Sequence, residues 1–251
     1  MRIVPGLCHR IASPEGLRWA SGVGQLDKVL AGGLTGGCVH EVYAAEVGDA
    51  TSAAGFAVAL ATGMVAGAGR GAMWLRSRRS QGMAGGVQAS GWAELGGAPG
   101  LGLLAVLPDT MALLRAAVDA LRSPALGAVI VEGWGAMREL DLTASRRLVL
   151  AAKKSGVPLL LLRIDAAPVP SAARTRWQVA AAPSRPLPGK APGSPCFDVT
   201  LLRQRSGPCG LSWRLEWNRD QCRFHEAPLS GAMVSVPADR SAADRGDRQA
   251  A

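Results

Sequence analysis

The stretch GGLTGGCVHEVYAAEVGDATSAAGF, residues 32–56, carries the most structural information in this sequence. It begins with a glycine turn, continues in an apolar strand and ends in a small-residue segment suited to a helix. Proteins that bind nucleoside triphosphates place a phosphate loop, G-x-x-x-x-G-K-[ST], at such a strand–helix junction. The same register here holds Ala44, Asp49, Ala50 and Thr51, and only the threonine matches. The scaffold is kept, and the phosphate-binding residues are replaced.

Each replacement weakens phosphate binding. Ala50 stands in the place of the lysine and loses a charge-assisted hydrogen bond worth about 1.5–3 kcal/mol. Asp49 brings a carboxylate toward a polyanion, where like charges ~4 Å apart cost about 4 kcal/mol at an effective dielectric constant of about 20. Ala44 removes the conformational freedom of a glycine at the start of the loop. We therefore expect no nucleotide cofactor.

Strand and helix patterns alternate along the first two thirds of the chain. Apolar runs predict strands at residues 38–43, 72–75, 103–107, 128–131 and 157–162. Amphipathic or small-residue patterns predict helices at residues 25–30, 53–65, 110–121 and 143–154. Asp109 is placed to cap the third of these helices. This alternation predicts the α/β class, a doubly wound, mostly parallel sheet with right-handed crossovers.

The last third of the chain has a different texture. Shorter strands are predicted at residues 176–180, 197–203, 211–217 and 222–224. The turn-rich segments between them favour antiparallel hairpins that extend one sheet edge. The predicted organisation is an N-terminal extension (1–20), a core domain (21–225) with its degenerate phosphate loop (44–51) and edge strands (about 174–225), and a disordered tail (226–251).

Several residues of this core resemble one known family. RecA-family cores place matching residues before the phosphate loop, as here Gly24, Leu26, Asp27, Leu30, Gly32, Gly33, Leu34, Gly37, Glu41 and Tyr43. The core strands and the edge segments TRWQVAAAPS (175–184) and FDVTLLRQRSGPCGLSWRLEW (197–217) look most like the ImuA family. These are RecA-like accessory proteins of bacterial SOS mutagenesis cassettes, and the resemblance covers residues 20 to 225.

The resemblance implies an accessory role in translesion DNA synthesis. Its implied protein partners are an ImuB-like relative of Y-family polymerases, a DnaE-type error-prone polymerase and, as a further contact, RecA. Two alternatives stay open, a RecA-like protein that binds DNA directly and a relative of the SOS cell-division inhibitor.

Two further positions of RecA-type ATPases also differ here. The sequence RSRR (residues 76–79) follows the second strand, where these enzymes carry an acid that activates water. Glu132 ends the fourth strand, where an Asp would organise Mg²⁺, and we expect a structural role for it. Together with the phosphate loop, three sites of an ATPase therefore lack the residues that ATP hydrolysis requires. We predict a protein without catalytic residues and without ATP hydrolysis.

Tryptophan is unusually frequent, with seven Trp against one Tyr and three Phe. Trp213 and Trp217 should share one face of a strand beside Leu215. One interpretation places the edge-strand tryptophans in the core. The other is a surface patch for a protein partner or DNA, since Trp and Arg are enriched in interface hot spots. That patch would consist of Arg174, Arg176, Trp177, Arg203 and Arg214.

Composition sets the remaining expectations. A net charge of +9 favours polyanionic partners such as DNA, although a GC-rich genome also raises arginine content. The basic pairs at residues 146–147 and 153–154 fit a solvated helix face. Five scattered cysteines predict reduced thiols, with neither a disulfide framework nor a metal site. No apolar run is long enough for a membrane helix and no signal peptide is recognisable, so we expect a cytoplasmic protein.

Overall fold

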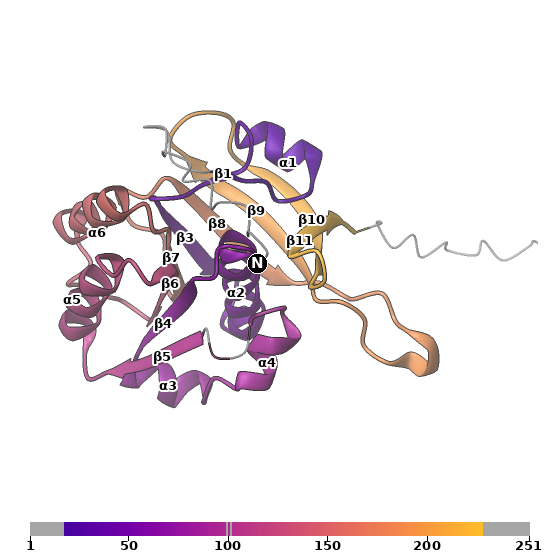
Figure 1. Cartoon of the computed structure of the whole chain (residues 1–251), viewed down its shortest axis with the longest axis horizontal. Coiled ribbons are helices and arrows are strands. Elements are labelled where there is room, and N and C mark those ends of the chain that lie inside the picture. The colour runs from indigo at the N-terminus through magenta and orange to yellow at the C-terminus, as the bar shows by residue number, and fades with distance from the viewer. Residues whose placement is uncertain (1–17, 99, 101, 228–251) are drawn as a thin grey trace, which may run out of the picture.

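The protein is described by a computed structural model that covers residues 18–98, 100 and 102–227 (Figure 1). Helices lie on both faces of a large central sheet. The helices are α1 (Gly24–Val29), α2 (Ala50–Val65), α3 (Arg78–Ala84), α4 (Ala89–Glu94), α5 (Thr110–Leu121) and α6 (Leu142–Ser155), with the 3-10 turns η1 (Val47–Asp49) and η2 (Pro188–Lys190).

The central sheet has nine strands. They are β3 (Val39–Ala44), β4 (Gly71–Ser77), β5 (Gly102–Leu107), β6 (Leu126–Trp134), β7 (Leu159–Ile164), β8 (Thr175–Ala181), β9 (Cys196–Gln204), β10 (Leu211–Asn218) and β11 (Arg223–Glu226). The spatial order is β11-β10-β9-β8-β3-β7-β6-β4-β5. The neighbours from β8 to β5 pair in parallel, and β9 to β11 continue antiparallel. The predicted α/β class, mostly parallel with antiparallel edge strands, is confirmed.

Two details differ from the sequence-based expectation. Strand β8 opens the antiparallel extension by pairing with β9, as expected, but on its other side it pairs in parallel with β3. It does so because β7 and β8 lie on opposite sides of β3, and their connection has to cross that strand. The short helices α3 and α4 were not predicted, since their sequences RRSQGMA and ASGWAE are too short to show a clear period.

Alternate side chains of the sheet build two separate cores. Helix α2 covers one face, where Val42 and Ile130 pack with it, and α5 and α6 cover the other, where Val39 and Val129 lie. Small residues let α2 approach the sheet closely, and its Ala57 is fully buried. Both sheet faces are covered at β6 and β7, and this explains the continuous apolar runs of these two parallel strands.

The glycine turn of the opening stretch has a steric cause. Strand β1 (Arg18–Trp19) pairs antiparallel with β2 (Leu34–Thr35) directly after the turn. Gly33 has φ +112°, and a Cβ at this position would lie 2.1 Å from the carbonyl oxygen of Trp19. Only glycine satisfies both constraints. Since β1 lies within the predicted N-terminal extension, the folded part begins before residue 21.

The C-terminal boundary also shifts slightly. We predicted a disordered tail from residue 226, but Glu226 belongs to β11, and Ala227 is buried with its N–H donating to the Arg214 carbonyl. The rest of the predicted tail, residues 228–251, lies outside the described residues. Within the part of the chain that the structure describes, no helix is long and apolar enough to cross a membrane.

A buried polar chain ties β2, β3 and β8 together. Nε2 of His40 donates to the Thr35 carbonyl at 2.9 Å, which leaves Nδ1 to accept from the Thr175 hydroxyl at 2.8 Å. That hydroxyl in turn accepts from the Trp177 indole N–H at 2.8 Å. Burial lowers the pKa of His40 from 6.5 to about 4. The imidazole is therefore neutral in the folded protein near neutral pH.

This histidine predicts a pH-dependent loss of stability. Between pH 6.5 and 4 the unfolded chain binds a proton at His40 that the folded protein does not, so unfolding becomes easier as the pH falls. Wild type should lose about 2 kcal/mol more unfolding free energy between pH 7 and pH 5 than His40→Gln. Urea titrations at both pH values measure this, with His225→Gln as the exposed control. Equal losses in wild type and His40→Gln would contradict the assignment.

Candidate functional site

The degenerate phosphate loop is anchored to the sheet by the residue that replaces its second glycine. Asp49 Oδ1 accepts a hydrogen bond from the Ala181 N–H at 2.8 Å, and Oδ2 accepts one from the Glu46 N–H at 3.2 Å. The Glu46 side chain in turn accepts a hydrogen bond from the Asp49 backbone N–H, so the two residues form a capping box at η1. Asp49 thus joins the loop after β3 to the end of β8. The sequence indicated a carboxylate here but not its backbone partners.

The backbone donors of the loop are also engaged. The N–H of Ala45 donates to the Val179 carbonyl at 2.8 Å, that of Asp49 to the Glu46 carbonyl at 3.1 Å, and that of Ala50 to Val47. A phosphate loop works because such N–H groups converge on the ligand. In this loop, four of them, including that of Glu46, already have partners within the protein.

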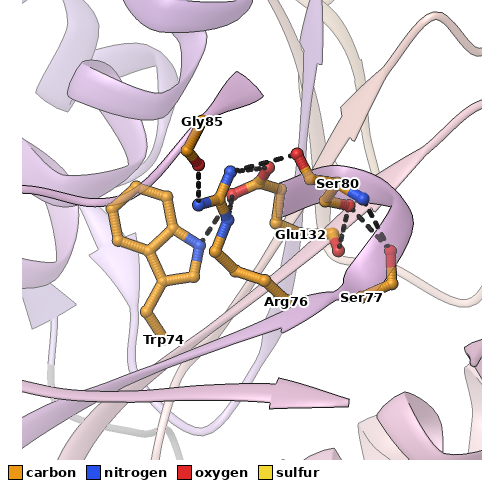
Figure 2. Close-up of polar contacts among 6 residues, drawn as sticks. All are labelled: Trp74, Arg76, Ser77, Ser80, Gly85 and Glu132. Atoms are coloured by element: carbon orange, nitrogen blue, oxygen red, sulfur yellow. Dashed lines mark hydrogen bonds and ion pairs between the residues drawn. The ribbon is translucent and has the colours of Figure 1, made fainter. Parts of the chain in front are cut away.

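A buried ion pair joins two of the residues that the sequence analysis compared with ATPase positions (Figure 2). Arg76 and Glu132 are register partners on the neighbouring strands β4 and β6. Nε of Arg76 lies 2.8 Å from Oε2 of Glu132, and Nη2 donates to Oε1 at 2.9 Å. The two side chains are only 3% and 1% exposed. The Trp74 indole N–H donates to Oε2 at 3.0 Å.

The same guanidinium holds the chain that follows β4. Its Nη1 donates to the Gly85 carbonyl at 2.7 Å and its Nη2 to the Ser80 carbonyl at 3.3 Å (Figure 2). The Ser80 hydroxyl donates to the Glu132 carbonyl at 3.3 Å, and Ser77 caps α3. The arrangement therefore links β4, β6 and α3 through buried side-chain contacts. A divalent cation bound to Glu132 would lie directly against the positively charged guanidinium of Arg76.

Four of the positions singled out in the sequence analysis come together in the structure. Ala50, Thr51, Arg76 and Glu132 line one hollow of about 230 Å³ at the carboxyl end of the parallel strands. The helix α4 contributes Trp92 to this hollow, and its ring lies 6.2 Å from that of Trp74, centroid to centroid. The remaining lining is mainly apolar, with Ala54, Val58, Val87, Leu95 and Ile164 among it. Indole rings thus stand beside the loop that would have held phosphates.

The predicted surface patch is wrong for two of its five residues. Trp177 is 1% exposed and packs on Phe56 of α2, with ring centroids 6.3 Å apart. Arg176 is 9% exposed, and its Nε contacts Glu41 Oε2 at 2.7 Å. The cause is the alternation of β8: Trp177 faces one core, and Arg176 faces the segment that crosses β3. The alternation of Thr175, Trp177 and Val179 is the sequence signal that could have indicated the core position of Trp177.

The other three patch residues remain partly or fully accessible. Arg174 is half-buried, and Arg203 is exposed with Nη1 donating to the Ser171 carbonyl at 3.2 Å. Arg214 forms a two-bond pair with Asp198 at 2.8 and 2.7 Å, across β9 and β10. Two of these three arginines are therefore already engaged by the protein itself, and no continuous Trp–Arg surface forms from the five.

The cysteines described by the structure are free thiols, at positions 38, 196, 209 and 222. Burial raises the pKa of the Cys38 thiol. Among residues 18–227 as far as they are described, no three His, Cys, Asp or Glu side chains gather as a metal site would require.

Removing one member of the central ion pair should destabilise the protein strongly. Arg76→Met leaves Glu132 buried with Trp74 as its one side-chain donor, and one-sided loss of a buried pair costs about 3–5 kcal/mol. Adding Glu132→Gln removes the charge and keeps an acceptor for Trp74, so the double variant should regain most of that loss. Urea unfolding followed by tryptophan fluorescence measures both.

Arg79→Met, an exposed neighbour on α3, serves as the control and should change stability by less than about 0.5 kcal/mol. A single variant as stable as wild type would show that the ion pair does not hold this end of the sheet.

Comparison with known proteins agrees with this architecture. No model of a known protein family matches the chain. The crystal structure of the RadB recombinase superposes with a TM-score of 0.50 at 14% identity, covering 84% of this chain and 100% of that one, and so shares its RecA-like fold. "Protein ImuA" of Caulobacter vibrioides, strains NA1000 / CB15N and ATCC 19089 / CIP 103742 / CB 15, is 33% identical over 202 residues. The match spans 74% of this chain and 77% of the relative, and the chain therefore belongs to the ImuA family.

Proposed function

We propose that this protein is a non-catalytic RecA-like accessory factor of SOS-induced translesion DNA synthesis, acting as a scaffold for protein partners. The observation that carries the proposal is the buried Arg76–Glu132 pair at the place of the ATPase acids. A guanidinium there can neither activate water nor share a metal ion. The family relationship supplies the cellular setting, SOS mutagenesis.

The closed loop supports the absence of nucleotide binding. Presenting the loop N–H groups to a phosphate would require breaking the bonds of Asp49 and Ala45 to β8. Ala50 offers no cation in return, and a lost charge-assisted hydrogen bond alone is worth about 1.5–3 kcal/mol. The protein therefore keeps the fold of a nucleotide-binding domain and fills its ligand site with internal contacts.

A protein without catalytic residues acts by binding other molecules at its surface. We infer that this surface binds an ImuB-like relative of Y-family polymerases and a DnaE-type error-prone polymerase, with RecA as a further contact. Direct DNA binding is the alternative, and the net charge of +9 favours it. One observation argues against DNA binding. The buried Arg176 donates hydrogen bonds to the Val169 carbonyl and the Ser171 hydroxyl, so it holds the segment after β7 and is not available to DNA. Protein partners are therefore the better-supported class.

The absence of nucleotide binding is directly measurable. Millimolar Mg-ATP should leave the unfolding temperature of wild type unchanged, because a ligand that does not bind the folded state cannot stabilise it. The variant Asp49→Gly/Ala50→Lys, which restores the second glycine and the lysine of the loop consensus, should also show no shift, since Arg76 still occupies the metal side. A saturable rise in the unfolding temperature of wild type would contradict the proposal.

The scaffolding role predicts stable complexes. The full chain, mixed with the ImuB-like protein and the DnaE-type polymerase of the same genome, should co-elute with at least one of them in size-exclusion chromatography. Fluorescence anisotropy with duplex and single-stranded DNA, over a range of salt concentrations, tests the alternative. Tight, salt-sensitive DNA binding without any protein complex would favour the DNA-binding function.

A further inference from the structure

The outer surface of α5 and α6 carries a hollow that the proposed function leaves unused. The two helices pack side by side on one face of the sheet (Figure 1). Their carboxyl-terminal halves border a depression of about 580 Å³, which we name the α5–α6 groove. Apolar and cationic side chains line it together: Val118, Leu150 and Ala151 with Arg122, Arg147 and Lys154.

Two of the three cations of this groove lack acidic partners among the described residues, and the third has a weak one. Among the ion pairs of the described residues, none involves Arg147 or Lys154. Arg122 reaches Asp119 at 3.4 Å, but both side chains are more than 70% exposed, and such a pair contributes little. The positive charge of the groove is therefore available to a ligand.

Helix electrostatics explains only part of this charge. Lys154 and Arg122 lie at the carboxyl ends of α6 and α5, where cations complement the helix dipole. Arg147 lies in the middle of α6, outside the reach of that effect. Arg147, Leu150, Ala151 and Lys154 follow the spacing of a single helix face. This helix face therefore combines apolar surface with Arg147, a cation that neither an ion pair nor the helix dipole accounts for.

Leu150 indicates what kind of molecule the groove accepts. Its side chain is 67% exposed, the highest value among the large apolar side chains of the described residues. A lone exposed leucine is ordinary, but this one stands between Arg147 and Lys154 in a hollow with Val118. A DNA backbone would engage the cations and leave Leu150 without an apolar partner. A peptide that carries both carboxylates and an apolar side chain satisfies both kinds of group.

We propose that the α5–α6 groove binds a short acidic segment of a protein partner, with a leucine-like side chain seated on Leu150 and carboxylates on Arg122, Arg147 and Lys154. The groove lies at the carboxyl ends of α5 and α6. This is the opposite end of the parallel strands from the loop of residues 44–51. The inference rests on the proposed scaffolding function and gives it a location and a ligand chemistry. A partner bound here leaves the edge strands β9 to β11 free.

The first test uses random peptides displayed on phage and selected on the full-length protein. We expect enrichment of sequences that place Asp or Glu around one large apolar residue. A synthetic peptide of the enriched sequence should bind Arg147→Glu/Lys154→Glu about tenfold or more weakly than wild type. Arg146→Glu/Lys153→Glu is the matched control, since it changes the same charge at neighbouring exposed positions and should stay within about twofold of wild type.

The apolar contact has its own pair of variants. Leu150→Asn should weaken the same peptide about tenfold, whereas Leu142→Asn, at an exposed leucine near the start of α6, should not. Circular dichroism and the unfolding temperature confirm that each variant is folded. The inference is overturned when selection enriches no acidic sequence, when both charge-reversed variants lose affinity equally, or when Leu150→Asn binds like wild type.

A second arm separates this inference from the proposed function. The polymerase partners are offered to wild type and to Arg147→Glu/Lys154→Glu. Loss of the complex in that variant alone supports the groove as the docking site. Equal binding by both proteins places the partner elsewhere and overturns the groove, while the scaffolding function stands. If wild type binds neither partner, the scaffolding function fails, and the peptide selection still decides whether the groove binds acidic segments.

Discussion

The buried ion pair between Arg76 and Glu132 is the contact on which the carboxyl end of the sheet depends. It bridges the neighbouring strands β4 and β6, fixes the indole of Trp74 and, through the Gly85 carbonyl, holds the chain that leads into α4. Charges buried to this degree persist only when they are paired and hydrogen-bonded. The carboxyl ends of these two strands are thus held together by side chains that satisfy each other's charge and hydrogen bonds.

The same principle governs the loop before α2. In a nucleotide-binding protein, the N–H groups of this loop donate to the phosphates of the ligand and lack those partners when no ligand is bound. Here Asp49 and the end of β8 supply those partners permanently. The domain gains a folded state that is complete without a ligand. In the function proposed above, the protein acts through its surfaces, and the α5–α6 groove is one of them.

Arginine has two different roles in this chain, and net charge does not distinguish them. Arg76 and Arg176 each pair with a buried glutamate, on opposite faces of the sheet. Arg163 is 3% exposed and lies over the ring of Tyr43 at 5.8 Å. These cations add to the formal charge of +9 but offer nothing to a polyanion. The cations that face solvent on α5 and α6, such as Arg147 and Lys154, remain accessible to a ligand.

The amino-acid pattern alone was sufficient for the α/β class, for nearly all strands and long helices, and for the cap at Asp109, whose side chain accepts from Ala112 N–H. These features follow from local periodicity and capping chemistry, which neighbouring residues encode. Local pattern could not reveal the parallel pairing of β8, the Glu41 partner of Arg176, the Ala181 partner of Asp49, or the meeting of Arg76 with Glu132. Each of those joins residues tens of positions apart, and their contacts exist only once strand order and register bring the two side chains to the same face of the sheet.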